Sequence, residues 1–189
     1  MVSATLSSWG RMAQKIRVPA GTFIGVVFLF LMHPSRRSLW IGGIVTFAGA
    51  ALRVWAAGHI EKGTVLARCG PYARTRNPLY VGSFLMALGI LLAGQGYWLL
   101  LPFFAFYGSV YYPVMKAEEQ ELLSGHGEAF LEYSRSVPLF FPSLTSRGSS
   151  SSDFLWARVI RNREHRNMAG LIVAELFLVL RWLYSSGGF

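Results

Sequence analysis

Five long apolar runs dominate the sequence and constrain its fold more than any other feature. A helix needs roughly 20 apolar residues to cross the hydrocarbon core of a bilayer, and these runs approach that length. Only 14% of the residues are charged, against about 25% in an ordinary soluble domain. The sequence therefore predicts an all-α integral membrane protein with about five transmembrane helices, in a single domain over residues 1–189. The predicted spans are residues 18–33, 39–57, 79–93, 97–115 and 169–184.

Positive charge predicts how these helices are oriented. The net charge is +9 at pH 7 and comes mostly from arginines at the ends of the apolar runs, a pattern that favours a membrane protein over a nucleic-acid binder. Since cytoplasmic loops carry an excess of arginine and lysine, residues 58–78 and 116–168 should face the cytoplasm, with residues 1–17 as a cytoplasmic leader. Arg36 and Arg37 fall on the opposite side in this scheme. We expect an integral protein of a prokaryotic plasma membrane.

Glycine and proline mark the joints and bends of the predicted helices. Gly94 and Gly96 enclose a single residue between the third and fourth apolar runs, and so short a joint dictates an antiparallel helical hairpin. Pro102 and Pro113 should bend the fourth helix or break its hydrogen bonding locally. The acidic first part of residues 116–133 should continue this helix into the cytoplasm.

Charged residues near or inside the apolar runs need their own explanations. Residues 153–166 mix arginines with aromatic and aliphatic residues, which predicts a helix lying on anionic lipid. Arg53 is inside the second run, where it either snorkels to the interface or faces a polar cavity. Glu175 is inside the last run. A carboxylate there costs about 2.5 to 3.5 kcal/mol on insertion scales, so Glu175 needs a partner or a wet cavity.

The most informative polar segment is GPYARTRNPLYVG, residues 70–82, between the second and third spans. Its glycine–proline and asparagine–proline pairs are turn signals, and its arginines and tyrosines suit a membrane border. A loop that anchors two helices would satisfy this pattern. A second polar segment, residues 116–142, follows the hairpin and contains the carboxylates Glu118 and Glu119, which on their own would be an ordinary solvated helix face. Because the two segments flank one hairpin, they should be neighbours on the cytoplasmic face.

Common catalytic and metal-binding motifs are absent from the sequence. We find no P-loop, no HExxH, no GxSxG and no metal-ligand spacing. The single cysteine excludes an internal disulfide and a cysteine-based metal cluster. The two polar segments therefore remain the best candidates for a site, and a basic, aromatic loop beside a carboxylate pair suits an amphoteric ligand.

Taken together, the two segments resemble the isoprenylcysteine carboxyl methyltransferase family and its phospholipid methyltransferase relatives. The family pattern is roughly G-x-Y-x-x-x-R-H-P-x-Y-x-G, a transmembrane hairpin, an acidic pair, and F/Y-x-x-Y-x-x-x-V-P. Here the matching stretches are GPYARTRNPLYVG, then AEEQELL and GEAFLEYSRSVPLFFP, within about residues 53–142. Asn77 stands where the family usually has histidine. Val114 and Met115 occupy the region where eukaryotic carboxyl methyltransferases have an arginine.

The resemblance implies S-adenosylmethionine as cofactor, bound in a cytoplasmic pocket formed by loops and helix ends. It implies methyl transfer to a lipophilic acceptor, with membrane lipids and a lipid-like substrate as the partners. The cofactor-binding residues that it carries over to this chain are Thr64, Val65, Leu66, Ala67, Tyr72, Asn77, Pro78, Leu79, Tyr80 and Glu118.

Elementary chemistry agrees with these assignments. Glu118 can pair with the cofactor's ammonium or accept from its ribose, Arg76 can meet its carboxylate, and Tyr72 and Tyr80 can pack on adenine or face the sulfonium. Arg53 is our candidate for orienting an anionic acceptor. A carboxylate acceptor needs no general base. An amine acceptor must lose a proton, for which the candidates are Glu119, His59 and Glu175.

Three other interpretations remain open on the sequence. The first is N-methylation of a phospholipid amine. The second is an NADPH-dependent membrane reductase of broadly similar helical architecture. The third is a membrane scaffold without enzymatic activity, in which substitutions within residues 70–82 would alter partner capture while no small molecule binds.

Overall fold

The computed structural model describes residues 8–61, 65–145 and 153–187, and all regular structure within these ranges is helical. The long helices are α1 (Ser8–Leu31), α2 (Arg36–His59), α3 (Pro78–Ala93) and α8 (Glu164–Ser185). One further long rod is built from η2 (Tyr97–Leu99), α4 (Leu100–Phe106), the π-helix η3 (Tyr107–Tyr111) and α5 (Tyr112–His126). The shorter helices are η1 (Gly70–Ala73), α6 (Glu128–Ser136) and α7 (Trp156–Arg161).

Four helices of the described chain are long and apolar enough to cross a membrane. They are Met12–Leu31, Arg36–His59, the rod Tyr97–His126 and Glu164–Ser185, and the expected integral membrane character follows from them. α3, the fifth expected span, has 16 residues and at 1.5 Å per residue is about 24 Å long, shorter than the roughly 30 Å hydrocarbon core.

Two predicted boundaries were wrong. Residues 8–17, expected as a leader, are the first turns of α1, because Pro19 is tolerated inside that helix. The surface helix expected over residues 153–166 is only α7, since Arg163 takes a left-handed backbone conformation with φ of 58° and α8 starts at Glu164. The fourth helix continues past residue 115 as predicted, and ends at His126, where Gly127 has φ of 53°.

α2 and α3 pack closely along a seam of small residues. An added Cβ on Gly42 of α2 would lie 2.3 Å from the backbone nitrogen of Ala93, and one on Gly49 would lie 2.7 Å from the carbonyl oxygen of Gly82. Gly89 of α3 faces Thr46 of α2 in the same way. Small residues allow helix backbones to approach closely in a membrane, where packing drives association.

The rod is irregular where proline interrupts it. Pro113 has no N–H to donate to the carbonyl of Ser109, four residues earlier, and η3 lies over this stretch. The indole Nε1 of Trp9 in α1 donates to that Ser109 carbonyl at 3.1 Å. The predicted local break in hydrogen bonding is confirmed, and it ties α1 to the rod.

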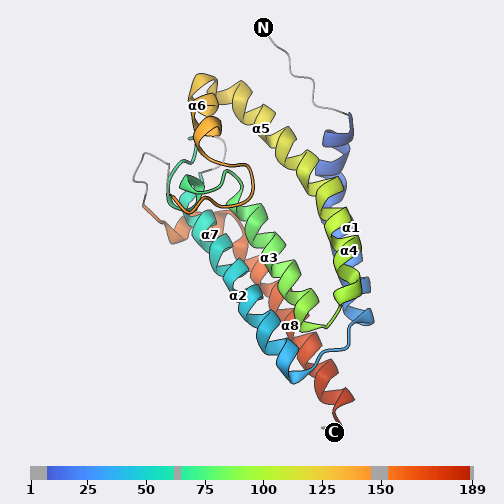
Figure 1. Ribbon diagram of the computed structural model, residues 1–189. Coiled ribbons are helices and arrows are strands. Elements are labelled where there is room, and N and C mark those ends of the chain that lie inside the picture. The colour runs from blue at the N-terminus through green and yellow to red at the C-terminus, as the bar shows by residue number, and fades with distance from the viewer. Residues whose placement is uncertain (1–7, 62–64, 146–152, 188–189) are drawn as a thin grey trace.

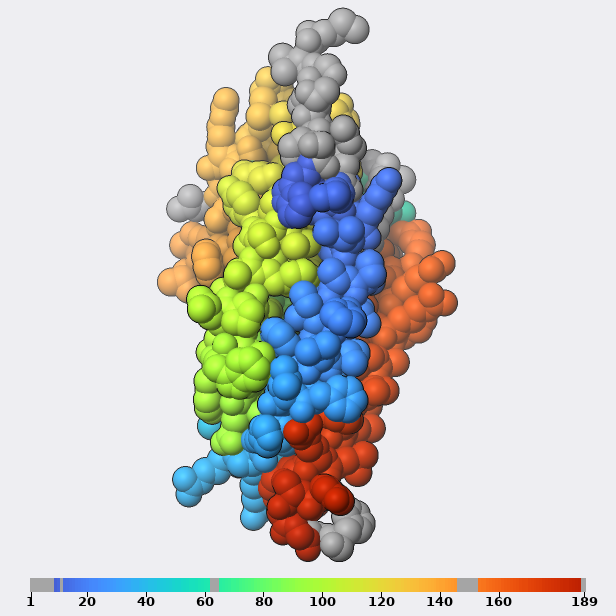
Figure 2. Space-filling view, turned by 90° about the vertical axis from the view of Figure 1, so that its right-hand side faces the viewer, coloured from blue at the N-terminus to red at the C-terminus, as the bar shows by residue number. Residues whose placement is uncertain are grey.

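The loops gather at one end of the helices (Figure 1), where η1, α6 and the ends of α2, α3 and α5 meet. We call this end, defined by residues 65–77 and 127–145, the loop end. The turns that follow α1 and α3 lie at the opposite end, where His33 N–H donates to the Gly94 carbonyl at 2.9 Å. The predicted hairpin between α3 and the rod is confirmed. Figure 2 shows α1 lying between the rod and α8 on one face of the molecule.

Candidate functional site

The loop that precedes α3 is shaped by glycine and proline. Gly70 has φ of 57°, and an added Cβ there would lie 2.7 Å from the imidazole of His59, so this turn requires glycine. Pro71 lies in the first turn of the 3-10 helix η1, and Pro78 lies in the first turn of α3, where a missing N–H costs no helical hydrogen bond. The loop thereby presents Tyr72, Arg76 and Tyr80 at the loop end.

Residues 137–143 pair with this loop through the backbone. The amide of Arg76 donates to the Pro138 carbonyl at 2.9 Å, and the amide of Ser143 donates to the Arg74 carbonyl at 2.8 Å. The hydroxyl of Thr75 donates to the Phe140 carbonyl at 2.8 Å. These bonds hold the loop in place against residues 137–143.

The carboxylate of Glu118 meets the start of α3. Tyr80 Oη donates to Glu118 Oε1 at 2.7 Å, and Arg17 Nη1 of α1 donates to the same oxygen at 3.0 Å. Arg17 Nη1 also donates to the Tyr80 hydroxyl, and its guanidinium carbon lies 5.6 Å from the centre of the Tyr80 ring. The predicted closeness of the acidic pair to the Asn77–Tyr80 corner is therefore observed. Arg17 was missed by the sequence reasoning.

The second carboxylate, Glu119, pairs with the loop arginine. Arg76 Nη1 lies 2.6 Å from Glu119 Oε1, and both side chains are 13% exposed. Lys116 Nζ donates to the other oxygen, Glu119 Oε2, at 2.9 Å. Arg76, predicted to meet the cofactor's carboxylate, and Glu119, a predicted candidate base, thus lie side by side.

Two buried donors in this region have no hydrogen-bond partner among the described residues, namely the hydroxyl of Tyr72 and Nε of Arg76. The buried acceptor Glu119 Oε1 also lacks a hydrogen bond there, although it is ion-paired with Arg76. Burial, and then the neighbouring Tyr133, raise the pKa of the Tyr72 hydroxyl, so it stays protonated and can donate. A buried donor without a partner costs free energy. A polar ligand with acceptor atoms would satisfy these donors. The residues present therefore fit a cofactor that carries an amino acid group and a ribose.

The other predicted cofactor residues are spread over the same end. Asn77 Nδ2 donates to the Leu139 carbonyl at 3.1 Å, Pro78 is buried, and the Leu79 carbonyl accepts from Arg53. Leu66 packs against the cluster of Phe130, Tyr133 and Val137, while Ala67 is half-buried and Val65 is exposed. Thr64 lies outside the described residues.

Arg53 of α2 is held by a carboxylate of α8 and by a hydroxyl of α3. Its Nε and Nη2 donate to Glu164 Oε2 and Oε1 at 3.0 and 2.7 Å, and Nη1 donates to the hydroxyl of Ser83. This bidentate pair joins α2, α3 and α8. The role of Arg53 in orienting an anionic acceptor stays a prediction, and the structure gives its guanidinium a packing role as well.

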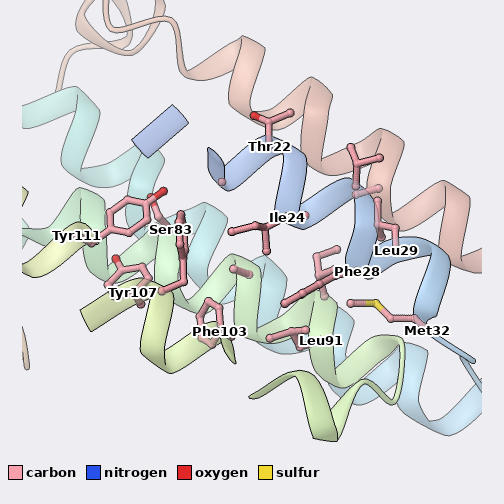
Figure 3. Close-up of a pocket in the computed structure, with 17 residues that line it drawn as sticks. Thr22, Ile24, Phe28, Leu29, Met32, Ser83, Leu91, Phe103, Tyr107 and Tyr111 are labelled. Atoms are coloured by element: carbon pink, nitrogen blue, oxygen red, sulfur yellow. The ribbon is translucent and has the colours of Figure 1, made fainter. Parts of the chain in front are cut away.

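An apolar cavity of about 320 Å³ runs from this region along the helices (Figure 3). Tyr107, Tyr111 and Ser83 lie at one end, and Met32 and Leu91 lie at the other. α1 contributes one wall, including Gly21 and Gly25. Because the Tyr80 and Tyr111 rings contact edge to face at 5.8 Å, the Tyr111 end of the cavity adjoins the Arg17–Glu118 group.

A second, larger cavity of about 860 Å³ lies between α2 and α8. Glu175 lines this cavity, and its Oε1 is buried without a hydrogen-bond partner, as is the nearby Thr46 hydroxyl.

The candidate base His59 contacts Trp55 and Phe154. Of the three candidate bases, only Glu119 lies beside Arg76. Among the described residues, no group of three or more His, Cys, Asp or Glu side chains is placed to hold a metal ion.

Comparison with known proteins points to one family. Residues 53–127 match the family model described as phospholipid methyltransferase. The nickel-cobalt-cadmium resistance protein NccN of Alcaligenes xylosoxydans xylosoxydans is 34% identical over 140 residues, 68% of this chain and 65% of that protein. The cobalt-zinc-cadmium resistance protein CzcN of Cupriavidus metallidurans is 34% identical over 102 residues, 52% of this chain and 47% of that protein. The chain spans less than two thirds of the length of these curated relatives. No solved structure matches it.

Proposed function

The chain belongs to the phospholipid methyltransferase family over residues 53–127, and we propose that it transfers a methyl group from S-adenosylmethionine to a carboxylate of a lipophilic acceptor in the membrane. The observation that carries this proposal is the junction of the two sequence segments. Tyr80 and Glu118 share a hydrogen bond of 2.7 Å, and Arg76 and Glu119 lie 2.6 Å apart. Tyr80 contacts Tyr111, which lines the apolar cavity, so a polar cofactor and an apolar acceptor can meet here.

Residues of the loop end and of the neighbouring parts of α3 and α5 supply the contacts that such a cofactor needs. Glu118 is the partner for an ammonium, and Arg76, with its unpartnered Nε, is the partner for a carboxylate. The buried Tyr72 hydroxyl donates to a ribose or carboxylate oxygen, and the Tyr80 ring offers a face for a cation. S-adenosylmethionine, when bound, supplies an electrophilic methyl group on a sulfonium.

The protein's part in the transfer is positioning and exclusion of water. The reaction forms an oxygen–carbon bond as the sulfur–carbon bond breaks, and an ionised carboxylate gives up no proton. Positioning the reactants is therefore the main requirement. The cavity walls keep water from the acceptor, since most of the residues that line it are apolar. Amine methylation would instead require a base, for which Glu119 is the candidate beside Arg76.

The two relatives are named for resistance to nickel, cobalt, cadmium and zinc. Their names say nothing of an acceptor. We propose for this chain that any part in such resistance runs through methylation of a membrane component.

A cofactor panel tests the proposal directly. In detergent, S-adenosylmethionine or S-adenosylhomocysteine should raise the melting temperature of the protein, because a ligand that binds only the folded state stabilises it. Glu118→Ala should remove the shift. Glu121→Ala, a change of an exposed carboxylate on the same helix, should keep it. A shift with NADPH and none with S-adenosylmethionine would point to the reductase and overturn the proposal.

A further inference from the structure

Arg17 is a charged member of the site that the family match does not include. It lies on α1, outside residues 53–127. Both hydrogen bonds that it makes to described residues run through Nη1, to Glu118 Oε1 and to the Tyr80 hydroxyl. Its Nε and Nη2 have no such bond within the described chain. Half of the guanidinium therefore remains available for a second acceptor group.

The Arg17–Glu118 ion pair can open at a low cost in free energy. The two side chains are 29% and 34% exposed, whereas those of Arg76 and Glu119 are 13% exposed. A partly exposed ion pair contributes little net free energy, because water solvates both charges when the pair opens. A competing cation can therefore displace Arg17 from Glu118 at low cost.

Arg17 also lies one helical turn from the apolar cavity. Gly21, one helical turn further along α1, lines the cavity, and an added Cβ on Gly21 would lie 3.5 Å from the Tyr111 hydroxyl. Residues four apart on a helix lie on the same face. An amphiphile with its apolar tail in the cavity would place its polar head beside this guanidinium.

On the basis of the proposed function, we propose that Arg17 binds the acidic head of the acceptor. Until the cofactor binds, Glu118 keeps Arg17 paired and so unavailable to the acceptor. Glu118 cannot neutralise both Arg17 and the cofactor's ammonium. Once the ammonium takes Glu118, Arg17 is left without its counter-ion and attracts an anion. Cofactor and acidic acceptor should then bind with positive coupling, and the coupling is reciprocal.

Calorimetry of S-adenosylhomocysteine binding in lipid nanodiscs tests this coupling. The added amphiphiles are dodecanoate and dodecanol, which share a tail length and differ in head charge. Dodecanoate should tighten S-adenosylhomocysteine binding by about fivefold or more, and dodecanol should not. Arg17→Gln should abolish the difference while binding S-adenosylhomocysteine at least as tightly as the unaltered protein, because Glu118 is then free of its competitor.

Two further variants separate charge from fold. Arg17→Lys should retain part of the coupling, since the positive charge remains. Lys15→Gln, a neutralisation on an exposed part of the same helix, should retain all of it. If the unaltered protein binds no S-adenosylhomocysteine, the proposed function fails. If it binds but responds equally to dodecanoate and dodecanol, or if Arg17→Gln keeps the coupling, the role assigned to Arg17 is wrong and the proposed function stands.

Discussion

At the scale of single residues, the arginines divide between packing and ligand binding. Arg53 and Glu164 form a bidentate pair in which the Glu164 side chain is only 4% exposed. Arg17, by contrast, is held by one partly exposed carboxylate. The burial of each pair, more than its distance, indicates which arginine can change partners.

Removing Glu164 should destabilise the fold. Glu164→Ala leaves the Arg53 guanidinium buried without its counter-ion, and such a change costs about 3 to 5 kcal/mol. Thermal unfolding in detergent should show a marked fall in melting temperature. Glu132→Ala removes a carboxylate that is 83% exposed and 3.8 Å from Arg68, and should leave the melting temperature nearly unchanged. Equal effects of the two changes would contradict the packing role of the Arg53–Glu164 pair.

The Tyr80 hydroxyl should matter for ligand binding more than for folding. Tyr80→Phe keeps the ring and removes the hydroxyl that holds the Glu118 carboxylate in position. S-adenosylhomocysteine binding should therefore weaken by about tenfold, because the carboxylate is no longer oriented toward the ligand's ammonium. Calorimetry measures the change. Tyr97→Phe, at the other end of the molecule and exposed, is the matched control. Unaltered affinity in Tyr80→Phe would remove Tyr80 from the site.

The sequence predicted the neighbours that the hairpin brings together and missed those that only packing brings together. Tyr80 and Glu118 lie on the two arms of one helical hairpin, so their closeness follows from chain connectivity. Arg17 is 101 residues from Glu118, and no local pattern records such a contact. Its one signal was an arginine at the edge of an apolar run without an assigned role.

At the scale of elements, helix type was predictable and helix ends were not. Apolar runs gave the long helices because their length suits a bilayer. The first span is predicted to begin at residue 18, yet α1 begins at Ser8 and passes through Pro19, since the loss of one hydrogen bond in a long helix is tolerated where neighbouring elements support it. Arg163 ended the expected surface helix through a backbone conformation that composition does not reveal.

Two neighbouring glycines of α2 should respond differently to substitution, because only one of them lies in the α2–α3 seam. Gly42→Ala brings a methyl group within 2.5 Å of backbone atoms of Gly89 and Ala93, and overpacking of this kind costs about 1 to 3 kcal/mol. Gly43→Ala meets no atom within 4 Å and should be neutral or slightly stabilising. Melting temperatures in one detergent compare the two. A tolerated Gly42→Ala would mean that the helices can separate along the seam without penalty.

At the scale of the whole molecule, the polar loop end lies near an apolar cavity, and the proposed chemistry needs both. Cofactor contacts come from the loop end, whereas the acceptor's tail needs the space between α1, α3, α8 and the rod. Changes to the cavity should therefore separate acceptor binding from cofactor binding.

Filling the cavity should block the acceptor alone. Gly25 lines the cavity, and an added Cβ there meets no atom within 4 Å, so Gly25→Leu can place its side chain in the open space. We expect normal S-adenosylhomocysteine binding and methyl transfer reduced by about tenfold or more, if loss of the tail's burial removes at least ~1.4 kcal/mol. Gly170→Leu on α8, also without atoms near its Cβ and outside that lining, is the control. Undiminished transfer in Gly25→Leu would place the acceptor elsewhere.

The central claim is most directly tested by methyl transfer itself. Purified protein in nanodiscs is incubated with methyl-labelled S-adenosylmethionine and a bacterial lipid extract, and the labelled product is identified by mass. The account predicts a labelled lipophilic methyl ester with the unaltered protein and with Glu121→Ala, and none with Glu118→Ala. A folded protein that labels no lipid, or a Glu118→Ala variant that labels as well as the unaltered protein, would contradict it.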